Sequence, residues 1–179
     1  MHTRQSEFER IRTVLAEADG DEPLSAREIV QLLEDHDIEV DLIDESGDTA
    51  EFILREAEDR GDLAPGVEIL ECSTGNAGIA CTFVGRHRGY DVTVVMPEEM
   101  SEERKKVIRA YGGNLIETPG GESDVDLAME RVEELLSENP ERYWFPNQFS
   151  NPDNPRAHEE TTGPEILDQL DEAPAAFVA

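Results

Sequence analysis

The chain has 179 residues and a formal net charge of −28, from 43 acidic residues against 15 basic ones. This charge argues against nonspecific binding to nucleic acid and against binding to an anionic membrane surface. No apolar stretch approaches the roughly 20 residues that span a bilayer, and the polar stretch 1–12 does not resemble a signal peptide. The carboxylates are dispersed, and only Lys105 and Lys106 are lysines. So many like charges repel one another, and high salt screens this repulsion. The composition therefore predicts a cytoplasmic protein of a halophile.

Residues 1–46 are predicted to form a separate helical segment. Apolar residues recur there at helical spacing, and Ser25 with Glu28 can form a capping box for a second helix. Two short helices in this order are typical of the start of a helix-turn-helix module, which would bind DNA. The alternative is a helical appendage or a subunit contact. Four arginines against fourteen acidic residues in this segment favour the alternative. The junction with the next domain is expected within 44–48.

From Thr49 onward, helical and extended patterns alternate. The expected helices cover 49–60, 76–87, 100–111, 123–137 and 157–170. The expected strands cover 67–72, 92–96, 114–117, 143–145 and a last one that starts at 177. Alternation at this spacing predicts a parallel sheet with helices on both faces. The fold class is therefore a three-layer α/β domain over 47–179, preceded by the short helical segment.

The turn between the first strand and the helix that follows it carries the sequence STGNAGIA, residues 73–80. A turn rich in Ser, Thr and Asn at a helix N-terminus offers hydroxyls, an amide and free backbone N–H groups to an anion. The plainer interpretation is a helix cap followed by a glycine turn. Cys72 and Cys81 flank this turn, and two interpretations stay open for them. They are either two reduced thiols of the core or a redox pair. The first interpretation is favoured, because a free cysteine behaves as a small buried apolar residue.

Four blocks from Thr49 to the end of the chain resemble, in order, the cysteine synthase and cystathionine β-synthase family of pyridoxal-phosphate enzymes. Together they span about 130 of the 179 residues. The last block is the most specific. The blocks are AEDRGDLAPG (57–66), STGNAGIA (73–80), MPEEMSEERK (96–105) with AYGG (110–113), and NQFSNP (147–152) with its continuation to Ile166. The resemblance implies fold type II, pyridoxal phosphate as cofactor, and β-replacement or elimination on an activated serine in cysteine biosynthesis.

Residue by residue, the resemblance implies a set of neutral ligand-binding groups. Asn76 matches the asparagine that hydrogen-bonds the ring hydroxyl oxygen of the cofactor. Ser73, Thr74 and Gln148 match residues that bind the substrate carboxylate, a task that suits donors at a helix N-terminus. Phe149 would wall the site and help to exclude water. From the residues alone, Gln148 and Phe149 are an ordinary loop amide and a core aromatic. No metal is expected.

The chain departs from the family pattern at three places. The family's Schiff-base lysine precedes the helix that begins near Thr49, but residues 44–48 read DESGD. Lys105 and Lys106 match a different helix and are expected to be solvated. The final residues resemble the strand before the family's glycine-rich phosphate loop, which does not follow here. Ala77 replaces a threonine that contacts substrate in the synthases, which puts substrate choice in doubt.

Three hypotheses follow from the matches and the departures. The first is part of a cysteine synthase-like enzyme, a truncated or split gene product that is inactive alone and has no catalytic lysine. Its partners would be a small amino-acid substrate and either a second copy of the chain or a complementing fragment. The second is a non-catalytic regulatory or binding protein, with the helix-turn-helix-like segment fused to a degenerate pyridoxal-phosphate domain. The third is a relic that folds poorly because its sheet lacks a covering domain.

Overall fold

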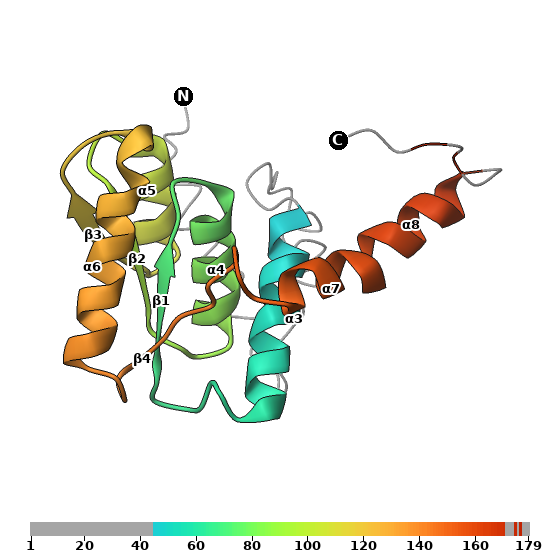
Figure 1. Cartoon of the computed structure of the whole chain (residues 1–179), viewed down its shortest axis with the longest axis horizontal. Coiled ribbons are helices and arrows are strands. Elements are labelled where there is room, and N and C mark those ends of the chain that lie inside the picture. The colour runs from blue at the N-terminus through green and yellow to red at the C-terminus, as the bar shows by residue number, and fades with distance from the viewer. Residues whose placement is uncertain (1–44, 171–173, 175, 177–179) are drawn as a thin grey trace.

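The computed structural model describes residues 45–170, 174 and 176 (Figure 1). The predicted helix-turn-helix segment and the last predicted strand lie outside the described residues, and the proposed boundary between residues 46 and 47 stays a prediction. No helix among the described residues is both long enough and apolar enough to cross a membrane.

In the part of the chain that the structure describes, four parallel strands form one sheet in the order β3-β2-β1-β4. β2 lies in register with β1 through Ile69 opposite Val92, and β3 in register with β2 through Val95 opposite Ile116. The strands are β1 (Glu68–Cys72), β2 (Val92–Pro97), β3 (Asn114–Thr118) and the two-residue β4 (Tyr143–Trp144). The parallel α/β sheet predicted from the alternating pattern is therefore confirmed.

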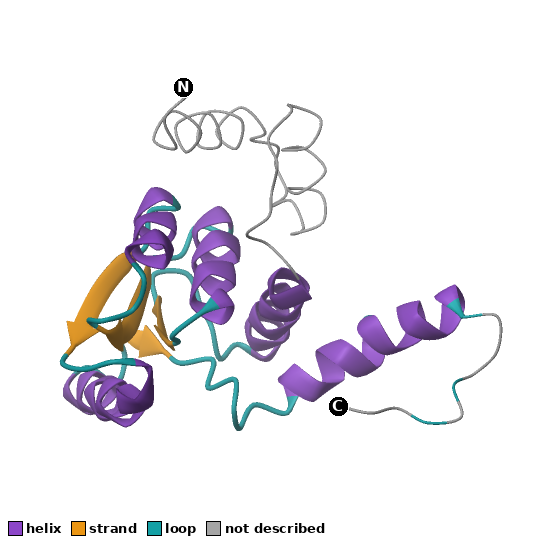
Figure 2. Cartoon of the chain, turned by 90° about the horizontal axis from the view of Figure 1, so that it is seen from above, coloured by secondary structure: helices purple, strands orange, loops and turns teal. Residues whose placement is uncertain are grey.

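Helices cover both faces of this sheet, as seen from above in Figure 2. On one face lie α4 (Asn76–His87) and α5 (Glu102–Ala110), with α3 (Glu45–Arg60) packed beyond α4. On the other face lies α6 (Val125–Glu138), which follows a short 3₁₀ turn, η1 (Glu122–Asp124). The chain then leaves the sheet through α7 (Asp153–Glu160) and α8 (Thr162–Gln169), which project away from it (Figure 1).

Strand alternation divides the core into two apolar clusters. Ile69 and Val94 face α3, α4 and α5, whereas Leu70 and Val95 face α6. All four side chains are fully buried, as expected for parallel strands covered on both faces. By the same alternation, Glu71 shares the face of Ile69, so a carboxyl group enters the layer beneath α3 and α4.

Two predicted helices differ from the observed ones by more than two residues at an end. α3 begins at Glu45, four residues before the predicted start, so it includes most of the segment expected to be a junction. The single helix expected over 157–170 is two helices that meet at Thr161. In a continuous helix the ring of Pro164 would clash with the carbonyl of Glu160, so the proline instead occupies the first turn of a new helix. The helix predicted over 76–87 is confirmed with the same bounds.

Candidate functional site

The turn after β1 holds Ser73 at the carboxyl edge of the sheet. Ser73 is buried, and its N–H donates to the carbonyl of Val95 at 3.3 Å. Its hydroxyl accepts the N–H of Gly75 at 3.2 Å, which closes a tight turn before the helix. Gly75 is the N-cap of α4 and offers no side-chain cap, and the first turn of that helix has no acidic residue. A helix start without a negative charge leaves its partial positive charge available to an anion.

Close packing keeps this turn in place. A Cβ atom on Gly78 would lie 3.1 Å from Cγ1 of Val94 and 3.2 Å from Cβ of Ser73. A hydrogen atom at this position therefore lets α4 approach both the strand and the turn. On the outer side, Arg104 of α5 donates to the carbonyl of Thr74 at 3.1 Å. The turn is thus tied to two neighbouring elements before any ligand arrives.

A cavity of about 520 Å³ lies next to the turn, between α3, α4 and the segment that follows β4. Residues from five parts of the fold line it, among them Ile53, Glu71, Ala77, Cys81, Gln148 and His158. Its volume is in the usual range for a small-molecule pocket. It lies at the carboxyl end of β1, where parallel α/β sheets place ligands.

Two segments far apart in sequence meet at this cavity. The side-chain amide of Gln148 donates to Oε1 of Glu71 at 3.1 Å, across 77 positions of sequence. Burial raises the pKa of Glu71 to about 8, and the hydrogen bond from Gln148 opposes this rise only in part. Glu71 is therefore mostly protonated at pH 7, and it adds little negative charge to the cavity.

Both cysteines are free and buried, as the core interpretation predicts. Burial, together with the neighbouring carboxylate of Glu71, raises the pKa of Cys72 to about 11. The same two causes hold the pKa of Cys81 well above its ordinary value. Neither thiol is therefore ionised at neutral pH, and thiolate chemistry is not available at this site.

The predicted site residues occupy different places around the cavity. Gln148 lines it, whereas Ser73 and Thr74 belong to the turn directly before Ala77, which lines it. Asn76 is the exposed first residue of α4. Phe149 is 76% exposed and does not line the cavity. Its proposed role as a wall of the site stays a prediction.

Sequence reasoning missed Glu71 and His158 as cavity residues. A signal for Glu71 was present, because an acidic residue inside an otherwise apolar buried strand needs a reason. His158 had no such signal, because it lies in a polar helix and reaches the cavity only through the placement of α7. Among the described residues, no cluster of His, Cys, Asp and Glu could hold a metal ion.

The expectation for one of the two lysines is wrong. Lys105 was expected to be solvated, but it is 2% exposed. Its ammonium group contacts the carbonyl of Glu98 and the carboxylates of Glu117 and Glu102, the last at 3.2 Å. A buried ammonium needs such partners because desolvation alone would be costly. Lys106 is exposed, as expected. Neither lysine lines the cavity.

The fold and the cavity define a class of protein: a parallel α/β domain with a pocket of small-molecule size at a strand-turn-helix edge. The family model for pyridoxal-phosphate dependent enzymes matches residues 48–179, and the chain belongs to that family. Cysteine synthase A of Escherichia coli K12 is 48% identical over 127 residues, which are 71% of this chain and 39% of that protein. This chain thus spans about two fifths of the length of that relative.

Solved structures of cysteine synthases and related enzymes also match this chain. The crystal structure of cysteine synthase from Entamoeba histolytica matches with a TM-score of 0.66 at 40% identity, over 70% of this chain and 37% of that one. The structure of O-ureido-L-serine synthase matches with a TM-score of 0.64 at 40% identity, over 70% of this chain and 39% of that one. The fold type II architecture inferred from the sequence is confirmed.

The residues of this chain fit the family's cofactor in one respect and not in another. The uncharged turn from Ser73 to Asn76 suits an anionic oxygen. Covalent attachment of pyridoxal phosphate requires a lysine amine. Lys105 is engaged by carboxylates on α5 and β3, and Lys106 is exposed on α5. Among the described residues, no lysine amine therefore lines the cavity to form the covalent link.

Proposed function

We propose that the described part of this chain forms the substrate-carboxylate side of a cysteine synthase-like site. In the whole protein, that site would serve pyridoxal-phosphate dependent β-replacement or elimination on an activated serine. The observation that carries the proposal is the contact between Gln148 and Glu71 at 3.1 Å. This contact places the Gln148 amide at the end of β1, beside Glu71 and two residues before Ser73. The amide and the Ser73 turn can therefore bind the same ligand.

The charges around the cavity favour a carboxylate. Glu71 lines the cavity, and because burial raises its pKa to about 8, it does not repel an anion at pH 7. The N-terminus of α4 has no acidic residue in its first turn. Neutral donors such as Ser73 and Gln148 can bind a carboxylate without the cost of burying an unpaired cation.

The names of the relatives indicate the substrate class. They include cysteine synthases and an O-ureido-L-serine synthase, whose names point to serine derivatives and cysteine. A ligand with an amino-acid carboxylate and an O-substituted side chain is therefore the first to test. O-acetyl-L-serine fulfils both conditions.

We further propose that this chain alone does not catalyse the reaction. The absent group is the amine, because neither Lys105 nor Lys106 lines the cavity. Added pyridoxal phosphate should therefore dialyse away, and borohydride should fix no cofactor on the protein. Mass spectrometry after reduction measures this. A yellow adduct fixed on Lys105 or Lys106 would contradict the proposal that neither lysine can hold the cofactor.

Calorimetric titration with O-acetyl-L-serine tests carboxylate binding directly. The methyl ester of the same compound lacks the anion and should not bind. Ser73→Ala and Gln148→Ala should each weaken binding about tenfold, the effect of losing one hydrogen bond to a charged group. Ser150→Ala is the matched control, because Ser150 is exposed on the same loop as Gln148. Equal binding of acid and ester would refute the proposed carboxylate site.

A further inference from the structure

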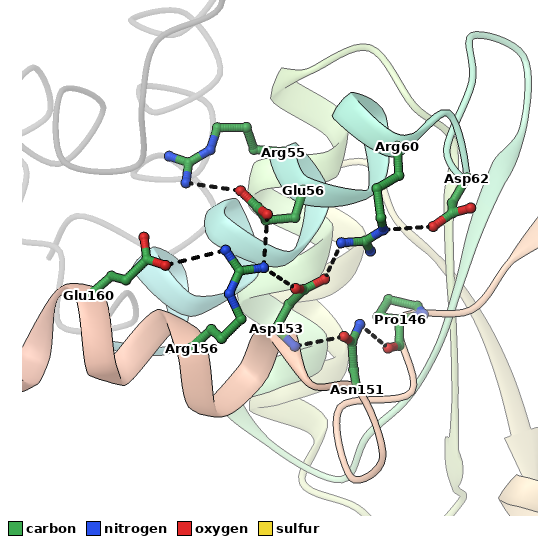
Figure 3. Close-up of polar contacts among 9 residues, drawn as sticks. All are labelled: Arg55, Glu56, Arg60, Asp62, Pro146, Asn151, Asp153, Arg156 and Glu160. Atoms are coloured by element: carbon green, nitrogen blue, oxygen red, sulfur yellow. Dashed lines mark hydrogen bonds and ion pairs between the residues drawn. The ribbon is translucent and has the colours of Figure 1, made fainter.

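A buried carboxylate joins α7 to α3 (Figure 3). Asp153, the first residue of α7, is 1% exposed. Its Oδ1 accepts a hydrogen bond from Arg156 at 2.9 Å. Its Oδ2 lies 2.8 Å from Nη1 of Arg60, as an ion pair without the alignment of a hydrogen bond. The carboxylate therefore has a cation from each of the two helices.

The arginines extend this contact into a network. Arg156 also donates to Glu56 of α3 at 3.0 Å, across 100 positions of sequence, and to Glu160 at 3.2 Å. Arg60 also donates to Asp62 at 2.9 Å. A buried carboxylate is tolerated only when its partners are correctly placed, so removing one partner is costly. The contacts of Asp153 with Arg60 and of Arg156 with Glu56 are the ones that hold α7 against α3.

The same carboxylate-bearing residue closes the loop that carries Gln148. The N–H of Asp153 donates to Oδ1 of Asn151 at 2.9 Å, and the amide of Asn151 donates to the carbonyl of Pro146 at 2.8 Å (Figure 3). The amide of Asn154 donates to the carbonyl of Gln148 at 2.9 Å. The two ends of the loop are therefore tied together beside the point where Asp153 is held to α3.

The network and the contacts within the loop hold two walls of the cavity together. Ala50, Ile53 and Leu54 line it from α3, and Gln148 lines it from the loop. We propose that Asp153 is a positioning residue: through Arg60 and Arg156 it locks the loop 146–152 against α3 and so holds Gln148 at the carboxylate site. This inference rests on the proposed function for its consequence in binding, but its structural content can be measured without any ligand.

Amide hydrogen exchange of the full chain tests the lock. In Asp153→Asn, the amides of Ser150, Asn151 and Asn154 should exchange about tenfold faster than in the wild type, because their acceptors lie within the loop. Amides of β1 and β2 should change little. Acceleration that spreads evenly over the sheet would reduce Asp153 to a general stability residue and overturn the proposal.

Two further variants guard against a failure of Asp153→Asn to fold. Arg60→Gln and Arg156→Gln each leave the carboxylate with its other arginine, and both should loosen the same loop. Asp62→Asn and Glu160→Gln are the matched controls, since each removes an exposed partner of one of these arginines. The controls should exchange like the wild type. Equal exchange in the arginine variants and the controls would overturn the proposal.

Titration with O-acetyl-L-serine then measures the consequence for binding. The arginine variants should bind about tenfold more weakly than the two controls, a change equivalent to about 1.4 kcal/mol. Gln148→Ala should abolish this difference, because the lock acts through that side chain. Absence of binding by the wild type would refute the proposed function, while the exchange data would still decide whether Asp153 locks the loop. Equal affinities in the arginine variants and their controls would overturn the positioning role of Asp153.

Discussion

The side-chain amide of Gln148 meets the buried carboxyl of Glu71 at 3.1 Å, and this contact joins the loop after β4 to the end of β1. Among the described residues, no lysine or arginine lines the cavity beside Glu71 to favour its charged form. The protonation state of Glu71 therefore controls the charge at the floor of the cavity.

Stability should fall as the pH rises from about 4.5 to about 8. Burial raises the pKa of Glu71 from its ordinary value of 4.5 to about 8. The folded chain therefore keeps a proton that the unfolded chain releases, and the unfolded state becomes favoured as pH increases. The expected slope is at most about 1.4 kcal/mol in the free energy of unfolding per pH unit.

Urea unfolding at several pH values, compared between the wild type and Glu71→Gln, measures this slope. The variant cannot release a proton, so its stability should depend less on pH in that range. Other titrating groups contribute equally to both proteins and cancel in the difference. Parallel pH curves for the two proteins would show that Glu71 is already ionised in the folded chain.

Lys105 should matter for stability, whereas Lys106 should not. Lys105 is buried and contacts Glu98, Glu102 and Glu117, and Lys106 is an exposed neighbour on the same helix. We expect Lys105→Gln to lower the free energy of unfolding by about 1–3 kcal/mol, the cost of unsatisfied buried partners. Lys106→Gln should change it by less than about 0.5 kcal/mol. Equal urea midpoints for the two variants would contradict the buried placement of Lys105.

Two glycines of α4 should separate effects on the site from effects on stability. A Cβ on Gly78 would press on Ser73 at 3.2 Å, and one on Gly85 would meet Val92 at 2.8 Å and Ile69 at 2.9 Å. Gly78→Ala should lose little stability, because alanine gains about 1 kcal/mol in a helix, but it should displace Ser73 and weaken carboxylate binding. Gly85→Ala should lose about 1–3 kcal/mol and keep its affinity.

Calorimetry with O-acetyl-L-serine and urea unfolding, done on both glycine variants, give the two readouts. Gly78→Ala should bind more weakly at nearly unchanged stability, whereas Gly85→Ala should be less stable at nearly unchanged affinity. If both variants lose affinity in proportion to stability, the Ser73 turn is not specifically placed by Gly78.

The two thiols should be unreactive in the folded chain. Burial raises the pKa of Cys72 to about 11 and that of Cys81 well above its ordinary value, so neither supplies a thiolate at pH 8. A chromogenic disulfide reagent should react with both cysteines in concentrated urea and with neither in native buffer. Rapid reaction of one thiol in native buffer would instead support a reactive cysteine at the cavity.

Salt should stabilise this chain strongly. Its net charge is −28, and the Debye length falls from about 10 Å at 0.1 M salt to about 3 Å at 1 M. The urea midpoint at pH 7 should therefore rise as KCl is added. It should rise less at about pH 4, because protonation of the carboxylates lowers the net negative charge there. An equal response at both pH values would count against screening as the cause and against the halophile prediction.

Local patterns in the sequence determined much of the fold. The apolar run of β2 indicated a strand buried on both faces, and the helix from Asn76 to His87 was predicted with its observed bounds. The turn from Ser73 to Asn76 and the loop around Gln148 were recognised from short strings of residues. Such features depend on neighbours within a few positions, and periodicity and turn chemistry report on that range.

Tertiary structure alone decided which of these residues meet. Glu71 acquires its raised pKa from burial beneath α3 and α4, and Lys105 changes from an expected surface charge to a buried ion pair because α5 packs beside β3. Asp153 forms its ion pair with Arg60 only because α7 packs against α3. These contacts join residues distant in sequence, and their energies depend on desolvation, which no local pattern reports.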